Sequence, residues 1–370
     1  MSESDDAYNF LLEVFADRHG CVYDIEILPP GFGPLLRDGA SIGITKRALA
    51  QAFVIARGIF FKWKNADSDS ANNEKSPAEE GLLFDDVGVK IASEIILLFD
   101  SEHLTACNWR RQRLLRLKKI AKSDEYIEAV QEEVSFTTTL LRSPLHRHAK
   151  SPTIWHHRYW IMIEIFQLGI EHAAKILSKP EEASPIALQE DDAVVREMFF
   201  QHELVVALRA GEQHPMNYYA FSYLRQFLSL STPAECQSSL NHLQSEGTEA
   251  LEMVHKWCLS HPHDISGWMF LLHMLELLNN KAGQTAFIAG TVSYALDVDW
   301  EGEALWIFLK ISLSRFKLDL TSLDSRILTA YQQKRSTGIR DSKHRWMDLA
   351  AQAKIDIRGQ IPNVDQQRNV

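Results

Sequence analysis

Apolar side chains recur every three or four residues along most of the chain, which is the period of an amphipathic helix. One clear example is the segment IWHHRYWIMIEIF at 154–166, whose apolar stripe consists of Trp155, Tyr159, Met162 and Phe166. Strict alternation of apolar and polar residues, typical of half-buried strands, is scarce, and Gly/Asn turn signals are few. The pattern therefore predicts an all-α fold.

Three polar segments interrupt this pattern, at 65–81, 178–192 and 332–343. They contain too few apolar side chains to offset the conformational entropy that would be lost on ordering. We expect them to be loops or disordered insertions.

The helical segments between these interruptions form a divergent repeat. Five short segments align on one anchor position, and each is preceded by an amphipathic run; the anchors are Cys107, Trp155, Phe221, Trp268 and Trp306. Each repeat therefore predicts a helix, a short loop and a second helix. Because an isolated helical hairpin cannot bury its apolar face, successive hairpins must stack, with the anchor side chains packed between them.

This repetition divides the chain into four predicted parts. Residues 1–84 form an N-terminal helical segment, in which 44–63 is a further helix packed on the first repeat. Residues 85–315 hold the five hairpins, for which we predict a right-handed alpha-alpha superhelix. Capping helices at 316–356 and a polar tail at 357–370 complete the chain.

Composition and charge narrow the class of protein. The chain has 370 residues, of which 45% are hydrophobic and 24% charged, as in ordinary soluble globular proteins. Its formal net charge of −10 does not favour a general attraction to nucleic acid. The scattered cysteines indicate a reducing compartment rather than a disulfide framework; they are Cys21, Cys107, Cys236 and Cys258. With an acidic N-terminus and no long apolar run, we expect a cytoplasmic protein without a membrane span.

A metal site is one alternative interpretation of the clustered histidines, which are His146, His148, His156 and His157. Adjacent helical positions point about 100° apart, and no HExxH motif or cysteine pair accompanies them. We therefore favour repeat packing and loop surface for these residues, and for the HPH run at 261–263.

The segment WRRQRLLRLKKIAK at 109–122 could be a phosphate-binding stripe. Arg110 stands at a repeated arginine position and is expected to pair with an acidic side chain of a neighbouring helix. The other basic residues spread around the helix, so a solvated face is favoured over an acidic partner surface and over nucleic acid. The aromatic anchors are interpreted as core rather than as a ligand cage. Without GxSxG or GxxxxGK[ST] motifs, a self-contained active site is unsupported.

The second repeat resembles those of protein prenyltransferase alpha subunits. In that family the second helix of each repeat opens with a pattern of the form N-Y-x-x-W-x-x-R-x-W. The segment AKSPTIWHHRYW at 149–160 fits it with Lys150, Trp155, Arg158 and Trp160. Pro152 departs from the pattern, because many members have tyrosine there, and Pro144 interrupts the preceding loop.

The other repeats fit less closely. The first keeps Arg110 but has Cys107 at the aromatic position, whereas the third supplies Asn217 and Tyr218. Leucine replaces the arginine in the last three repeats, as Leu224, Leu271 and Leu309. The segments HDISGW and GEALW look most like the prenyltransferase alpha subunit repeat-containing proteins.

The resemblance implies an alpha chain that binds a separate beta subunit. That beta subunit would carry the catalytic zinc, which binds the substrate cysteine as thiolate. No metal or other cofactor is expected on this chain; the substrates of the complex would be a prenyl diphosphate and a cysteine-bearing protein. Lys150 is expected to stabilise charge on the departing diphosphate. Asn217, Tyr218 and Tyr219 are expected near the lipid diphosphate and the peptide.

Three hypotheses about function follow. The first is an alpha-type subunit of a heterodimeric protein prenyltransferase, with geranylgeranyl as the favoured lipid. The second is a non-catalytic helical-repeat scaffold or adaptor, favoured by the missing arginines of the last three repeats. The third, a metal-dependent enzyme built on the histidine cluster, would require tightly bound metal in the isolated chain.

Overall fold

The computed structural model divides the chain into two compact units, Met1–Pro233 and Ala234–Val370. It describes residues 3–18, 20–29, 31–70, 87–169, 172, 176, 192–231, 247–278, 280–298, 300 and 302–318. Most of these residues are helical, so the predicted all-α class is confirmed.

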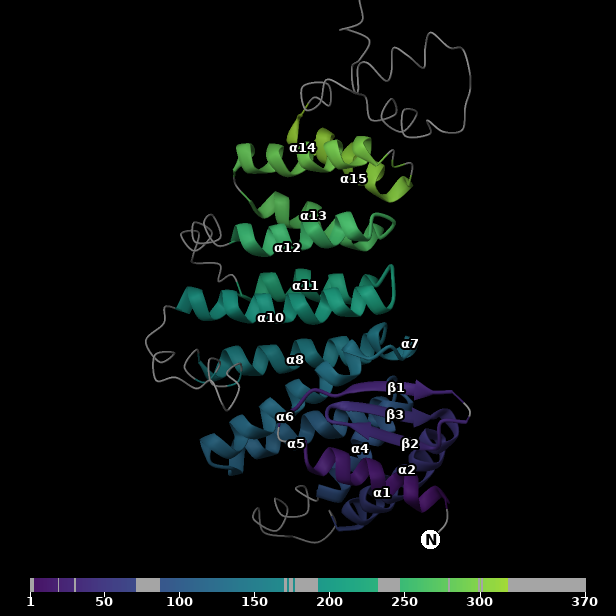
Figure 1. Ribbon diagram of the computed structural model, residues 1–370. Coiled ribbons are helices and arrows are strands. Elements are labelled where there is room, and N and C mark those ends of the chain that lie inside the picture. Colours follow the sequence, from purple (N-terminus) through teal and green to yellow (C-terminus); the bar gives the residue numbers. More distant parts are fainter. Residues whose placement is uncertain are drawn as a thin grey trace, which may run out of the picture. The chain divides into compact units, whose positions relative to one another are not determined.

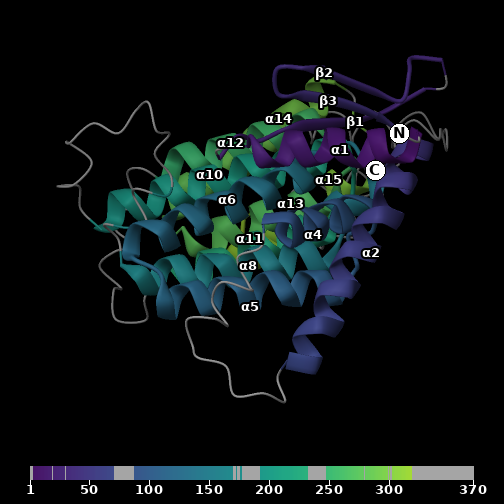
Figure 2. The same cartoon turned by 90° about the horizontal axis from the view of Figure 1, so that it is seen from below.

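The first unit contains three of the five predicted hairpins (Figure 1). They are α4 (Val87–Phe99) with α5 (Leu104–Ile120), α6 (Ser123–Arg142) with α8 (Pro152–Leu168), and α10 (Asp192–Gln213) with α11 (Tyr218–Ser231). A short helix, α7 (His146–Ala149), lies in the loop of the second hairpin. The second helices pack in the order α5, α8, α11, and α6 packs against α10 (Figure 2). Successive hairpins therefore stack as predicted, while the handedness of the stack stays a prediction.

The second unit contains the other two hairpins. They are α12 (Gly247–Ser260) with α13 (Ile265–Leu277), and α14 (Lys281–Asp297) with α15 (Glu303–Phe316). Within this unit α13 packs against α15, and α12 packs against α14.

A cap four residues before each anchor determines where the second helix begins. In the first four hairpins its side chain accepts a hydrogen bond from a backbone N–H of the first helical turn; these caps are His103, Ser151, Asn217 and Asp264. Side-chain caps satisfy N–H groups that a helix itself leaves without partners. Each anchor is thereby held in the first turn of its helix.

The N-terminal segment differs from the prediction, because it contains a sheet. Its elements are α1 (Glu3–Ala16), β1 (Asp24–Leu28), β2 (Leu35–Asp38), β3 (Ser41–Thr45) and α2 (Lys46–Ser70). The sheet has the order β1-β3-β2, with β1 parallel and β2 antiparallel to β3. The expectation of a purely helical segment before the first repeat was therefore wrong.

The sheet is joined to the second hairpin through β1, which packs on α6. The backbone N–H of Tyr23 donates to Oγ1 of Thr139 at 3.0 Å, and Oγ of Ser143 donates to the carbonyl of Ile25 at 3.2 Å. A polar side chain of α6 and that of the residue after it thus satisfy backbone groups in and directly before β1, an edge strand of the sheet.

The helix expected at 44–63 is present as α2, which packs on α1 and on α4 of the first hairpin. It continues through residues 65–70, which were expected to belong to a loop or disordered insertion. A helix satisfies its backbone hydrogen bonds internally, so it can extend as a polar segment beyond its packed part. Residue 192, assigned to the second polar segment, likewise begins α10.

The remaining predictions about polar segments concern residues outside those described: 71–81, 178–191, 332–343, the capping helices beyond 318 and the tail at 357–370. Cys236 also lies outside, whereas Cys21, Cys107 and Cys258 are free thiols. Of the helices in the described ranges, none is both long enough and apolar enough to cross a membrane.

Candidate functional site

The anchor side chains are core residues, as predicted. All five are buried: Cys107, Trp155, Phe221, Trp268 and Trp306. Each anchor tryptophan also donates its indole N–H to the carbonyl six residues earlier. These bonds join Trp155 to Ala149 (2.8 Å), Trp268 to Pro262 (3.0 Å) and Trp306 to Trp300 (2.8 Å). The anchors therefore fix the loop of their own hairpin and do not form an exposed ligand cage.

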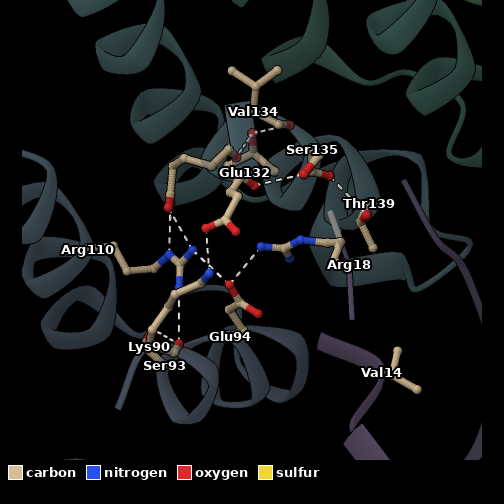
Figure 3. A network of polar contacts seen from close by, with 12 residues as sticks. Val14, Arg18, Lys90, Ser93, Glu94, Arg110, Glu132, Val134, Ser135 and Thr139 are labelled. Carbon is tan, nitrogen blue, oxygen red and sulfur yellow. Dashed lines mark hydrogen bonds and ion pairs between the residues drawn. The ribbon is translucent and has the colours of Figure 1, made fainter. Parts of the chain in front are cut away.

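Arg110 connects α4, α5 and α6 through buried polar contacts. Its Nε and Nη2 donate to the two carboxylate oxygens of Glu133 at 2.8 and 2.7 Å, which confirms the expected acidic partner on a neighbouring helix. Nη2 also contacts Oε1 of Glu94 at 3.2 Å, and Arg18 donates to that same oxygen at 2.9 Å (Figure 3). Burial would raise the pKa of Glu133, but the charge of Arg110 and a hydrogen bond from His157 hold it well below its ordinary value.

Arg158 makes the equivalent connection between the second and third hairpins. Its Nε and Nη2 donate to Glu203 at 2.6 and 2.8 Å, and its Nη1 donates to Thr137 and Thr138 at 2.8 and 2.9 Å. The hydroxyl of Tyr223 donates to the same glutamate at 2.5 Å. Both repeat arginines therefore bind a glutamate in the first helix of the next hairpin.

Sequence reasoning missed these glutamates, although a signal for them existed. Glu94, Glu133 and Glu203 each lie in an amphipathic first helix and are followed there by an apolar residue, and all three are buried. An acidic residue within a buried stripe requires a cationic partner, because an unpaired buried charge is costly. The repeat arginines would have supplied that partner.

The clustered histidines serve separate contacts. Nε2 of His157 lies 2.7 Å from Glu133, and Nε of Arg111 donates to Nδ1 of His157 at 3.1 Å. Because Nδ1 accepts that hydrogen bond, the geometry corresponds to the neutral imidazole with its proton on Nε2. His148 instead contacts the carbonyls of Leu97 and Leu98. Over the described ranges, no three His, Cys, Asp or Glu side chains are grouped to hold a metal ion.

Several basic side chains of α5 are buried or form ion pairs within the first unit. Arg110 and Arg113 are buried, and Lys118 forms an ion pair with Glu164 at 2.8 Å, whereas Lys119 is exposed. The predicted solvated basic face was therefore wrong for Arg113, which is buried, whereas Arg110 was expected to pair with an acidic side chain.

Lys150 lies at the end of α7, in the loop that precedes α8. Its Nζ donates to the carbonyl of Pro215 at 2.9 Å, in the loop of the third hairpin. The neighbouring carbonyl of Ala149 accepts from the amide of Asn217 at 2.7 Å. Two hydrogen bonds thus join these successive loops. No carboxylate of the described segments forms an ion pair with Lys150, so its charge is not neutralised there.

The three residues predicted near the lipid diphosphate and the peptide, which are Asn217, Tyr218 and Tyr219, differ in burial. Asn217 is buried, caps α11 through Oδ1 and binds Ala149 through Nδ2, so its side chain holds the loop in place. Tyr218 and Tyr219 are 64% and 41% exposed, with ring centroids 5.9 Å apart. The structure thus has a cation in the loop of the second hairpin and two exposed tyrosines at the start of α11, directly after the linked loop of the third hairpin.

The two prolines that depart from the family pattern fit this geometry. Pro152 is the first residue of α8, a position where its missing N–H is not required. Residues after Pro144 form α7, so the longer loop is partly helical. Lys150 therefore follows a helical turn that ends at Ala149.

Comparisons with known proteins agree with this arrangement. The family model for the protein prenyltransferase alpha subunit repeat matches residues 130–164, which contain Glu133, Lys150, Trp155 and Arg158. The chain is also 27% identical over 96 residues to the geranylgeranyl transferase type-2 subunit alpha of Dictyostelium discoideum. Residues 130–164 of the chain therefore form a protein prenyltransferase alpha subunit repeat.

The likeness to that relative is partial, because the alignment covers 26% of this chain and 29% of the relative. A second family model, described as the ECM9 middle domain, matches residues 182–292. That range includes the third and fourth hairpins, in which leucine replaces the repeat arginine.

Proposed function

We propose that this chain is the alpha-type subunit of a heterodimeric protein prenyltransferase. Its partner would be a beta subunit that holds zinc, and the complex would transfer a geranylgeranyl group to a C-terminal cysteine of a protein. The family supports the subunit class, and a relative named as a geranylgeranyl transferase subunit alpha supports the choice of lipid.

The observation that carries this proposal is the placement of Lys150. Its ammonium group binds a neutral carbonyl, that of Pro215, so its positive charge stays available to an anion. A cation in that position would stabilise the charge that develops on the diphosphate leaving group, an effect that is strongest where water is excluded. The exposed rings of Tyr218 and Tyr219 would supply apolar and hydroxyl contacts at the start of α11.

The test is the substitution Lys150→Ala, assayed in the complex with a prenyltransferase beta subunit. We expect kcat to fall by about 10²-fold because one positioned charge is lost, while the two subunits still assemble. Lys119→Ala, which changes an exposed lysine of α5, is the matched control and should leave kcat unchanged. Unaltered turnover by the Lys150→Ala complex would contradict the assignment of this residue.

A second candidate function is a non-catalytic repeat scaffold. It is favoured by Leu224, Leu271 and Leu309, which are buried apolar residues where the first two repeats have arginine. The same assay separates the two functions, because a scaffold predicts that the wild-type complex has no prenyl transfer at all.

A further inference from the structure

The loop between α10 and α11 contains an unusual backbone conformation at Met216. Its φ angle is 57°, in the left-handed region that side chains with a Cβ atom disfavour. Lys317 is the other non-glycine residue with positive φ in the described ranges, and it follows the last helix of the second unit. Met216 is therefore alone in this respect among the described hairpin loops.

Met216 is 60% exposed. Its turned backbone also allows contacts by the neighbouring residues. Residues on both sides of Met216 make such contacts. Pro215 accepts the hydrogen bond from Lys150, and Asn217 caps α11 while binding the carbonyl of Ala149.

These contacts determine where the ammonium group of Lys150 lies. A residue with ordinary negative φ at position 216 would rotate the Pro215 carbonyl relative to Asn217. The loop could then keep the helix cap or the bond to Lys150, but not both in their present geometry. Without the carbonyl, the flexible lysine side chain would sample several rotamers.

We propose that Met216 is a positioning residue for Lys150: its left-handed backbone holds the Pro215 carbonyl against the ammonium group and thereby fixes where that charge lies. The consequence for catalysis rests on the proposed function. The positioning itself is a property of the folded chain and can be measured without any transfer reaction.

The experiment measures the acetylation rate of each lysine amine in the full-length chain by mass spectrometry. Three substitutions are compared with wild type. Met216→Asn and Met216→Gly tolerate positive φ, whereas Met216→Ile disfavours it strongly. Exposed Lys119 and ion-paired Lys90 serve as internal references.

We expect the isoleucine variant to raise the acetylation rate of Lys150 several-fold, toward that of Lys119, while the references stay constant. The asparagine and glycine variants should retain the wild-type rate. Should the isoleucine variant not fold, Met216→Ala supplies a milder test, with a smaller rise expected. Equal Lys150 rates in wild type and in the folded isoleucine or alanine variant would overturn the proposal.

Assays of the complex with a prenyltransferase beta subunit separate this inference from the proposed function. Met216→Ile should lower kcat roughly ten-fold, with the KM for the protein substrate unchanged and activity restored in Met216→Asn. A change in Lys150 reactivity without any change in kcat would support the positioning role and contradict the catalytic role of Lys150. A fall in kcat without changed reactivity would contradict the positioning role alone.

Discussion

At the scale of single residues, the first unit depends on ion pairs held where water is excluded. Arg110 and Arg158 each bind a glutamate of the following hairpin with two nitrogen atoms. Such pairs contribute geometric specificity, but the desolvation of both charges offsets much of their attraction. Removing one partner of a pair should therefore lower the free energy of unfolding far more than replacing both partners with apolar residues.

The substitution Arg158→Leu tests this asymmetry. It leaves the buried carboxylate of Glu203 without its cation, so we expect the free energy of unfolding to fall by about 3–5 kcal/mol in urea denaturation. The double variant Arg158→Leu with Glu203→Leu should recover most of that loss, because leucine stands at the equivalent arginine position in the third hairpin. A double variant as unstable as the single one would contradict the account.

A second prediction at this scale concerns pH and His255, in the second unit. Burial lowers its pKa to about 4, and its Nε2 lies 2.9 Å from Oγ1 of Thr291. In the unfolded chain the pKa returns to its ordinary value, about 6.5. Between these values the unfolded chain binds more protons, so the free energy of unfolding decreases as the pH falls from 6.5 towards 4.

The variant His255→Gln should lack this component of the pH dependence. Burial also lowers the pKa of His148, in the first unit, so wild type and variant must be compared rather than each judged alone. Denaturation curves at pH 7 and pH 5 give the loss in the free energy of unfolding between these pH values, once for wild type and once for the variant. Identical losses of stability in wild type and variant would show that His255 keeps its ordinary pKa when folded.

Some of these residues could be predicted from the sequence, and others could not. The anchors and the repeat arginines could be predicted because their spacing repeats. The positions of Lys150 and Tyr218 came from the family pattern, but that pattern did not show that the Asn217 side chain is buried. Nothing in the sequence indicates the backbone turn at Met216, because methionine has no preference for positive φ.

At the scale of elements, the second helix of each hairpin depends on how it begins. Asp264 accepts hydrogen bonds from the N–H groups of Ser266 and Gly267 at 2.9 and 3.1 Å. The cap lies one turn before Trp268, so it also fixes the register of that anchor.

We predict that Asp264→Ala lowers the free energy of unfolding by about 1 kcal/mol, because those N–H groups lose their acceptor. Asp264→Asn keeps an oxygen acceptor and should retain most of the stability. Urea denaturation of both variants measures the difference. Equal losses for alanine and asparagine would show that the cap is not the source of the effect.

The element that sequence analysis missed is the N-terminal sheet. Its strands have only four or five residues, and β1 pairs with β3 rather than with the strand that follows it. The Gly39-Ala40 turn between β2 and β3 was a usable signal, because glycine suits the positive φ of 57° that this turn has at Gly39. The parallel pairing and the support from Thr139 and Ser143 are long-range contacts that no local pattern encodes.

At the scale of the whole molecule, repetition predicted five helical hairpins in their order along the chain. It did not predict a division into two compact units, which falls between α11 and α12. The apolar period is the same on both sides of that division, so local patterns cannot locate it. The buried arginine–glutamate pairs belong to the first unit, whereas the second unit has leucine at both arginine positions.

The central claim is that this chain functions only with a prenyltransferase beta subunit. The most direct measurement is to purify the full-length chain under native conditions and identify its stoichiometric partner by mass spectrometry. The account predicts a prenyltransferase beta subunit in equimolar amount. Recovery of the chain without any such subunit, from cells that contain one, would contradict it.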